Sequence, residues 1–140
     1  MREYIVALAR KLIGTPYIWA GQTPWGFDCS GFVIWILQVF GVLPSGDWTA
    51  DSLSKRFERM KPMEYTPRFG DLVCYGTKQR ITHIAIYSGA GNQIAATGGG
   101  SDTTSLEVAK LRNAMVKEKP VNYRKDLVCY CNIEAPVCNK

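Results

Sequence analysis

The order of the apolar patterns constrains the fold of this chain most: helical patterns precede Gly70 and strand-like patterns follow it. Before that point, apolar spacing and closing glycines predict helices over residues 4–13 and 31–40, and a more polar helix over 49–60. After it, short β-branched and aromatic runs predict strands over 71–75, 82–88, 93–97, 115–121 and 127–133, with one short helix over 105–113. Such segregation favours an α+β fold with an antiparallel sheet.

Length and composition narrow the class of protein. The chain has 140 residues, enough for one compact domain over residues 1–140. Hydrophobic residues make up 46% and charged residues 21%, a globular composition that argues against disorder. The sequence contains no apolar run long enough for a transmembrane segment, and its first residues lack the long apolar run of a signal peptide. We therefore expect synthesis in the cytoplasm without a signal peptide.

The cysteines and the single histidine limit the metal chemistry to be expected. Five cysteines cannot all pair within one chain, and the apparent lack of a signal peptide favours reduced thiols. Their spacing does not match a structural zinc motif, and one histidine excludes a multi-histidine site. We expect no metal and no cofactor, and buried or surface-neutral thiols at four positions: Cys74, Cys129, Cys131 and Cys138.

Cys29 occupies a different position, where a loop enters the apolar helix over residues 31–40. A thiol there faces the unpaired N–H groups and the positive end of the helix dipole. Those groups favour the thiolate, which is the nucleophilic form. Ser30 and Gly31 leave room for a substrate carbonyl, and nearby backbone N–H groups could bind an oxyanion.

His83 is the one histidine of the chain and lies in the strand expected over residues 82–88. Its ordinary pKa suits proton transfer near neutrality, so it is the candidate general base for Cys29. The alternative is a histidine of the core or surface with no catalytic role.

Four short sequence motifs occur in order along the chain: GTPYIWAG, DCSGFV, GDLVCY and THIAIYSGAGN. Together they resemble the NlpC/P60 family of papain-like cysteine peptidases, from about Ile5 to about Ile133. The resemblance implies helices packed on an antiparallel sheet and hydrolysis of amide bonds in peptidoglycan peptides, usually between γ-D-glutamate and a diamino acid. It makes Cys29 the nucleophile and His83 the general base, which later acts as the acid for the leaving amine.

Further site residues follow from the same resemblance. Tyr17 is expected to line the site and to donate a hydrogen bond to the oxyanion, although a packing role is equally open. Asp28 and Ser30 flank the nucleophile and are candidates for binding a substrate amine, while Asp28 also suits a helix cap. Trp19 and Trp25 are candidates for cleft walls or for scaffold packing.

The sequence departs from the family pattern at the residue that orients the catalytic histidine. Twelve positions after His83, where the family has a polar residue, this chain has Ala95. Strand alternation puts Thr97 and Gln93 on the same face, and Thr97 is our candidate orienter. A backbone carbonyl or a water molecule could take the same role.

Other features bear on partners and location. The GGGSDTTS loop and the ending VNYRKDLVCYCNI resemble phage and prophage chains of the family, which implies action at the bacterial cell wall with lysis or tail proteins as partners. The rival interpretations are a noncatalytic wall-binding or tail module, and a thiol amidase or acyltransferase acting on another substrate.

Positive charge is concentrated in residues 110–125, which contain six basic residues and one acidic residue and so account for the formal net charge of +5. This window could attract anionic wall polymers, bind nucleic acid without specificity, or form a solvated sheet edge. The chain has no groove-reading motif, so we expect no specific nucleic-acid function.

Overall fold

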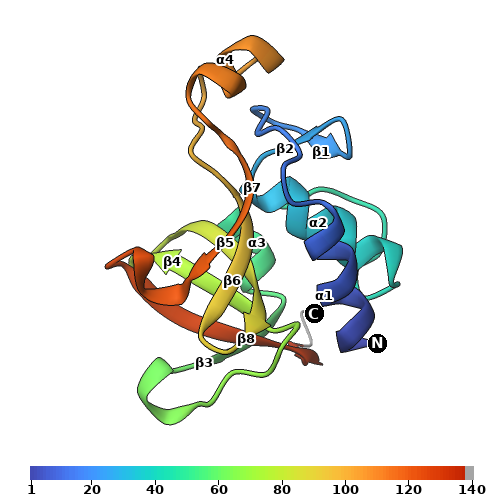
Figure 1. The fold of residues 1–140 in the computed structure, drawn as a ribbon. Coiled ribbons are helices and arrows are strands. Elements are labelled where there is room, and N and C mark those ends of the chain that lie inside the picture. Colours follow the sequence, from blue (N-terminus) through green and yellow to red (C-terminus); the bar gives the residue numbers. More distant parts are fainter. Residues whose placement is uncertain (138–140) are drawn as a thin grey trace.

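The computed structural model describes residues 1–137 and shows helices packed against a strongly curved sheet (Figure 1). Apart from the two-residue strands β1 and β2, the strands follow the first three α-helices. In chain order the elements are α1 (Arg2–Lys11), β1 (Gln22–Thr23), β2 (Gly26–Phe27), α2 (Cys29–Val39), α3 (Ala50–Ser54), β3 (Phe57–Met60), the 3₁₀ turn η1 (Pro62–Glu64), β4 (Leu72–Gly76), β5 (Ile81–Gly89), β6 (Asn92–Thr97), α4 (Leu106–Leu111), β7 (Met115–Pro120), the 3₁₀ turn η2 (Val121–Tyr123) and β8 (Leu127–Pro136).

The main sheet has six strands in the order β3-β8-β4-β5-β6-β7, and every neighbouring pair is antiparallel. The α+β fold with an antiparallel sheet is therefore confirmed. Strand β7 forms one edge, and it carries Lys117 and Lys119 of the basic window. Charged lysines on an edge strand oppose pairing with another chain, which supports the sheet-edge interpretation of that window.

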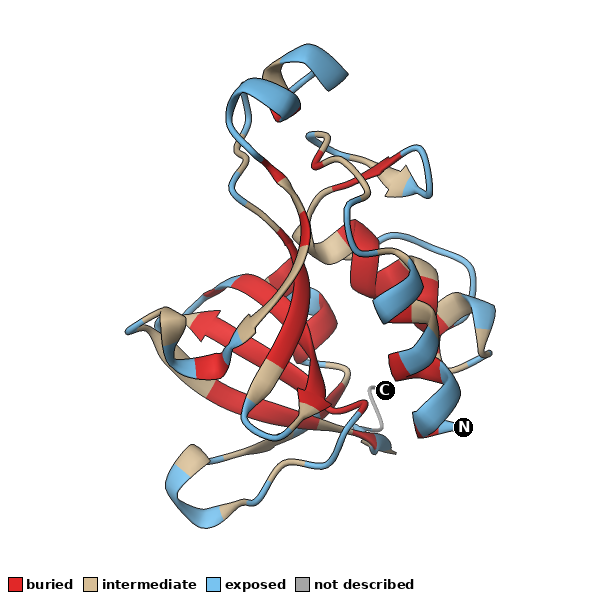
Figure 2. Cartoon of the chain, viewed as in Figure 1, coloured by how far each residue is buried: buried red, intermediate tan, exposed pale blue. Residues whose placement is uncertain are grey.

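Helix α2 is the central helix of the layer that covers the sheet. Its N-cap is Asp28, whose carboxylate accepts a hydrogen bond from the Gly31 N–H at 2.7 Å. Gly41, at φ +73°, follows the end of the helix in a conformation that favours glycine. The helix packs on β5 and β6 and against α1 and α3, and most of its side chains are buried (Figure 2). The apolar run over residues 31–40 thus forms the buried helix that the sequence predicts.

The two faces of the sheet carry different side chains. The face toward the helices contributes Ile84, Ile86 and Ile94 to the main core. The opposite face carries a second cluster that includes Tyr75 and Tyr87 and is partly covered by η2. Because strand residues alternate between faces, Ala85 and His83 of β5 belong to the tyrosine-bearing face.

The sequence prediction is wrong for the helix over residues 49–60. Helix α3 ends at Ser54, and residues 57–60 form β3, which pairs with β8. Phe57 is buried, and Arg59 lies opposite Cys131 in this ladder. Long-range pairing thus overrides the local helical pattern. Among residues 1–137, no helix is both long and apolar enough to cross a bilayer.

Candidate active site

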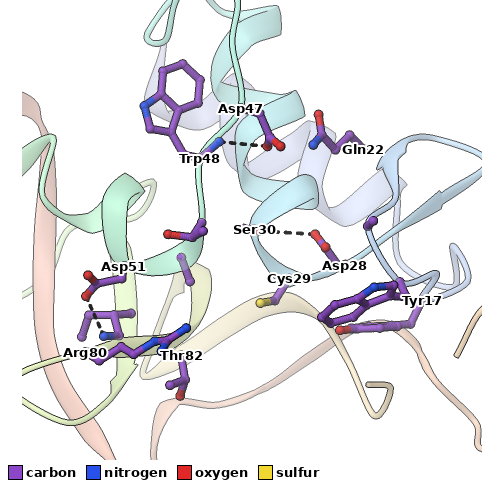
Figure 3. A pocket seen from close by; sticks show the side chains of 15 residues that line it. Tyr17, Gln22, Asp28, Cys29, Ser30, Asp47, Trp48, Asp51, Arg80 and Thr82 are labelled. Carbon is purple, nitrogen blue, oxygen red and sulfur yellow. Dashed lines mark hydrogen bonds between the residues drawn. The ribbon is translucent and has the colours of Figure 1, made fainter. Parts of the chain in front are cut away.

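Cys29 opens onto a cavity of about 510 Å³ at the N-terminal end of α2. Figure 3 shows its sulfur between Tyr17 on one side and Arg80 and Thr82 on the other. The start of β5 is fixed beside α3 because the Asp51 carboxylate accepts a hydrogen bond from the Ile81 N–H at 2.8 Å. The cavity is therefore built between the helix layer and one end of the sheet.

The pKa of Cys29 shows two opposing influences. Burial raises the pKa of the thiol to about 11, while hydrogen bonding from the backbone N–H groups of Ile84 and Ser30 lowers it. Burial outweighs the N–H groups, contrary to the expectation that the helix terminus would yield a thiolate. The thiol therefore keeps its proton at neutral pH and needs a base to become nucleophilic.

His83 is buried on β5, with 6% of its surface exposed. Burial, together with the positive charge of Arg124, lowers the pKa of its imidazole to about 4, although the Asp126 carboxylate partly offsets these effects. At neutral pH the ring is therefore uncharged and able to accept a proton. This is the protonation state that a general base requires.

The structure brings Cys29 close to the strand that carries His83 without a direct hydrogen bond between the two side chains. Ile84, the residue after His83, connects the two: its backbone N–H donates a hydrogen bond to the Cys29 sulfur. Arg124 also acts on both groups, because its charge lowers the pKa of each. Catalytic hydrogen bonds are often long in an enzyme without substrate and shorten in the complex.

Tyr123 is the residue at His83 that the sequence analysis missed. Its hydroxyl lies 3.5 Å from Nε2 of His83, and its ring packs edge-on against Tyr75. The Tyr75 ring in turn lies 5.6 Å from the imidazole, centroid to centroid. No motif pointed to Tyr123, because it belongs to η2, forty residues after the histidine.

The three positions considered for the orienting residue lie on β6. Ala95 and Gln93 are buried, and the Gln93 Oε1 has no hydrogen-bond partner among the described residues. Thr97 pairs with Met115 of β7, and the ladder between β5 and β6 stops at Ile86 and Ile94, before it reaches His83. Within residues 1–137, the Thr97 side chain makes no hydrogen bond to His83.

Tyr17 lies in the cavity wall and is buried. Burial, and then the nearby Cys29 and Asp28, raise its pKa, so its hydroxyl stays protonated and can donate. A side chain at Gly99 would overlap the Tyr17 ring, which shows how closely the loop after β6 holds it. Tyr17 thus lines the site as expected, and its role as an oxyanion donor stays a prediction.

The residues that flank the nucleophile also line the cavity. The Asp28 carboxylate accepts hydrogen bonds from the Gly31 N–H at 2.7 Å and from the Ser30 hydroxyl at 3.3 Å, so its cap role is realised. Burial raises the pKa of Asp28. Trp19 is half-exposed in the cavity wall, whereas Trp25 is 87% exposed and lies outside it. Trp25 is therefore neither cleft wall nor packed scaffold.

Sequence reasoning also missed several polar residues of the cavity. Asp47 and Asp51 add carboxylates to the wall, Arg80 adds a positive charge, and Gln22 and Trp48 complete it. The sequence signal near Asp47 and Asp51 is the capping box at Thr49. A capping box predicts where a helix starts, and it does not predict a cavity.

Comparison with known proteins places these features in a family. The model of the NlpC/P60 family matches residues 14–125, which is most of the chain. The chain belongs to the NlpC/P60 family. The NlpC/P60 domain of the peptidoglycan hydrolase SagA has the same papain-like fold, with a TM-score of 0.71 and 27% identity over 94% of this chain and 98% of that one.

Curated relatives are longer than this chain. "Protein P54" of Enterococcus faecium is 43% identical over 93 residues, which are 66% of this chain and 17% of that protein. "Probable peptidoglycan endopeptidase LytE" of Bacillus subtilis is 36% identical over 120 residues, 82% of this chain and 31% of that protein. The chain thus spans less than a third of the length of each of these two relatives.

Proposed function

We propose that this NlpC/P60 chain acts as one catalytic domain that hydrolyses amide bonds in peptidoglycan peptides through a Cys29 nucleophile. The observation that carries the proposal is the position of Cys29 at the N-terminus of α2, where it opens onto the cavity. There its sulfur accepts a hydrogen bond from the N–H of Ile84, the residue after His83. The named activity of LytE and of SagA supports the substrate class.

The chemistry follows from the two protonation states. As the Cys29 sulfur attacks the substrate carbonyl, its proton passes to the neutral His83 ring. The carbonyl oxygen becomes an oxyanion, which the N–H groups at the start of α2 and the Tyr17 hydroxyl stabilise. The amine leaves with the proton from His83, and water, deprotonated by the same ring, then hydrolyses the thioester.

The raised pKa of Cys29 favours proton transfer during attack over a preformed ion pair. The low pKa of His83, about 4, makes its protonated form a strong acid for the leaving amine. Because only the neutral ring accepts the proton, kcat/KM is expected to fall as pH drops through that value.

Tyr123 is the proposed positioning residue for His83. When Nε2–H of His83 donates to the Tyr123 hydroxyl oxygen, 3.5 Å away, Nδ1 is left as the ring nitrogen that accepts the Cys29 proton. A hydrogen bond at one ring nitrogen sets the tautomer and the ring orientation. Thr97 stays a prediction for this role, since its side chain makes no hydrogen bond to the ring in the described part of the chain.

The proposed scissile bond joins γ-D-glutamate to a diamino acid. The name of one relative, the "Gamma-D-glutamyl-L-lysine dipeptidyl-peptidase" of Bacillus cereus, supports this bond. The name of another, the "Gamma-DL-glutamyl hydrolase" of Bacillus subtilis, supports a γ-glutamyl bond. Asp28 and Asp47 add carboxylates to the cavity wall that suit the free amine of a stem peptide. Delivery to the wall by phage lysis or tail proteins is part of the same proposal.

The test is digestion of purified sacculi, with the released fragments identified by mass spectrometry. Wild type should release fragments ending in γ-D-glutamate, and Cys29→Ala and His83→Ala should release none. Release by either variant at the wild-type rate would refute the assignment of the pair, and a different product would refute the proposed bond.

A noncatalytic wall-binding module is the second candidate, favoured by Ala95 at the orienting position and by the raised pKa of Cys29. It predicts that wild type binds sacculi without cleavage and that iodoacetamide does not modify Cys29 selectively at neutral pH. The digestion described above separates it from the hydrolase.

A further inference from the structure

Three cysteines far from one another in the chain meet on the sheet. Cys74 of β4 lies opposite Cys129 in the ladder with β8, and Cys131 follows on the same face of β8. Their sulfur atoms all lie within 4.8 Å of one another, and those of Cys74 and Cys131 are 3.7 Å apart. All three side chains are buried beneath the helix layer. The sheet therefore holds a preformed triangle of sulfur atoms.

This triangle has the dimensions of a metal site. Metal–sulfur bonds of about 2.3 Å place the sulfur atoms about 3.8 Å apart in a tetrahedral site and about 4.0 Å apart in a trigonal one. The observed separations need little change to reach those values. Two paired strands carry the cysteines, so the backbone is already fixed in place.

We propose that Cys74, Cys129 and Cys131 bind one soft metal ion, Zn²⁺ or Cu⁺, through their thiolates. Three sulfur donors without imidazole or carboxylate select such ions over Mg²⁺ or Ca²⁺. The Ser54 carbonyl oxygen accepts a hydrogen bond from the Cys131 thiol at 3.5 Å, so an oxygen atom lies beside the triangle. Three sulfur–metal bonds form and three thiol protons pass to solvent.

Charge in the surroundings supports binding. Arg59 lies opposite Cys131 in the ladder with β3, so its positive charge lies close to the three sulfur atoms. It would also offset the negative charge of a metal ion with three thiolates.

The site is independent of the proposed hydrolase. None of the three cysteines lines the cavity at Cys29. Because they are buried, the ion has to enter while the chain folds, so the test starts from reduced, unfolded protein. The proposal can therefore fail while the proposed hydrolase stands, and the reverse also holds.

The experiment uses the Cys29→Ala, Cys138→Ala double variant, in which the three sheet cysteines are the remaining thiols. It is refolded with excess Zn²⁺ or, in a separate anaerobic arm, Cu⁺, then desalted, and its metal content is measured by mass spectrometry. We expect about one ion per chain in at least one arm. Adding Cys74→Ala or Cys131→Ala should weaken binding by more than about 100-fold, because loss of a hydrogen-bond partner of a ligand alone costs about 10–100-fold.

Val73→Ala is the matched control, because Val73 neighbours Cys74 on the same strand and faces the tyrosine-bearing side. It should keep the ion. Loaded protein should also unfold at a higher temperature than protein treated with a chelator, a difference that the cysteine variants lose. No retained ion in either arm, or an ion retained after the cysteines are removed, would overturn the proposal.

Discussion

Cysteine occurs in two contrasting regions of this molecule, at the end of α2 and on the sheet beneath the helices. Cys29 is partly accessible through the cavity, and its sulfur receives N–H groups from Ser30 and Ile84. Cys74, Cys129 and Cys131 are sealed in the core, and their sulfurs contact one another. Cys29 is therefore accessible to a substrate in the folded protein. The three sheet cysteines are accessible to an ion only while the chain folds.

The two regions also reverse the expectation from the helix dipole. Cys29, at the helix terminus, has a raised pKa because burial dominates, whereas Cys129, deep in the sheet, has a lowered pKa because two thiols donate to it. A low pKa therefore does not coincide with the proposed nucleophile. Cys29 is distinguished by its access to the cavity and by a nearby candidate base, and the predictions below test that distinction.

The largest effect is expected at Cys29. Cys29→Ser should lower kcat/KM for sacculus peptides by more than about 10⁴-fold, because the hydroxyl is a poorer nucleophile and triad-type losses are of this size. Cys129→Ser is the control and should keep the wild-type rate in any fraction that folds. If folded Cys129→Ser lost as much activity as Cys29→Ser, the proposal that only Cys29 acts in catalysis would be wrong.

His83 should make the stability of the fold depend on pH. Its folded pKa of about 4 lies below its ordinary value of 6.5, so the unfolded chain binds the extra proton first as pH falls. The stabilisation is full above pH 6.5 and is lost between 6.5 and 4, a change of about 3 kcal/mol. Urea unfolding across this range should show a steeper loss in wild type than in His83→Gln. Equal slopes would mean that His83 titrates normally.

Tyr123 and Thr97 are the two candidates for the residue that orients His83, and substitutions distinguish them. Tyr123→Phe removes the hydroxyl at Nε2 and should lower kcat about tenfold, the value of one hydrogen bond to a group that becomes charged. KM should stay unchanged and the acid limb of the pH profile should shift, which a merely structural change would not produce. Thr97→Val should leave kcat unchanged. A large loss in Thr97→Val with none in Tyr123→Phe would return the role to Thr97.

The fold class and the candidate positions of Cys29 and His83 could be predicted because both depend on local sequence patterns. The order of patterns predicted the antiparallel α+β class, and a loop that enters an apolar run marked Cys29 as a helix start. Local patterns failed where distant residues decide. Phe57 forms a strand because β8 offers a partner, although its own segment looks helical.

The residues that the sequence analysis missed also depend on distant parts of the chain. Tyr123 reaches His83 because η2 folds over the tyrosine-bearing face of the sheet. Cys74 meets Cys129 because β8 inserts between β3 and β4, a strand order that no pattern in the sequence specifies. The spacing argument against a zinc motif considered neighbours in sequence, and the sulfur triangle is made by neighbours in space.

The smallest effect is expected when one sheet cysteine is removed without metal present. In chelator-treated protein, Cys74→Ala should lower the free energy of unfolding by about 1 kcal/mol, because it deletes one buried sulfur and leaves a small cavity. The rate of hydrolysis should not change, since Cys74 lies outside the cavity at Cys29. Denaturant unfolding with and without Zn²⁺ checks both regions together. In wild type the ion should add stability, and in Cys74→Ala it should add none, because a triangle with one corner missing holds the ion too weakly to distinguish folded from unfolded chain.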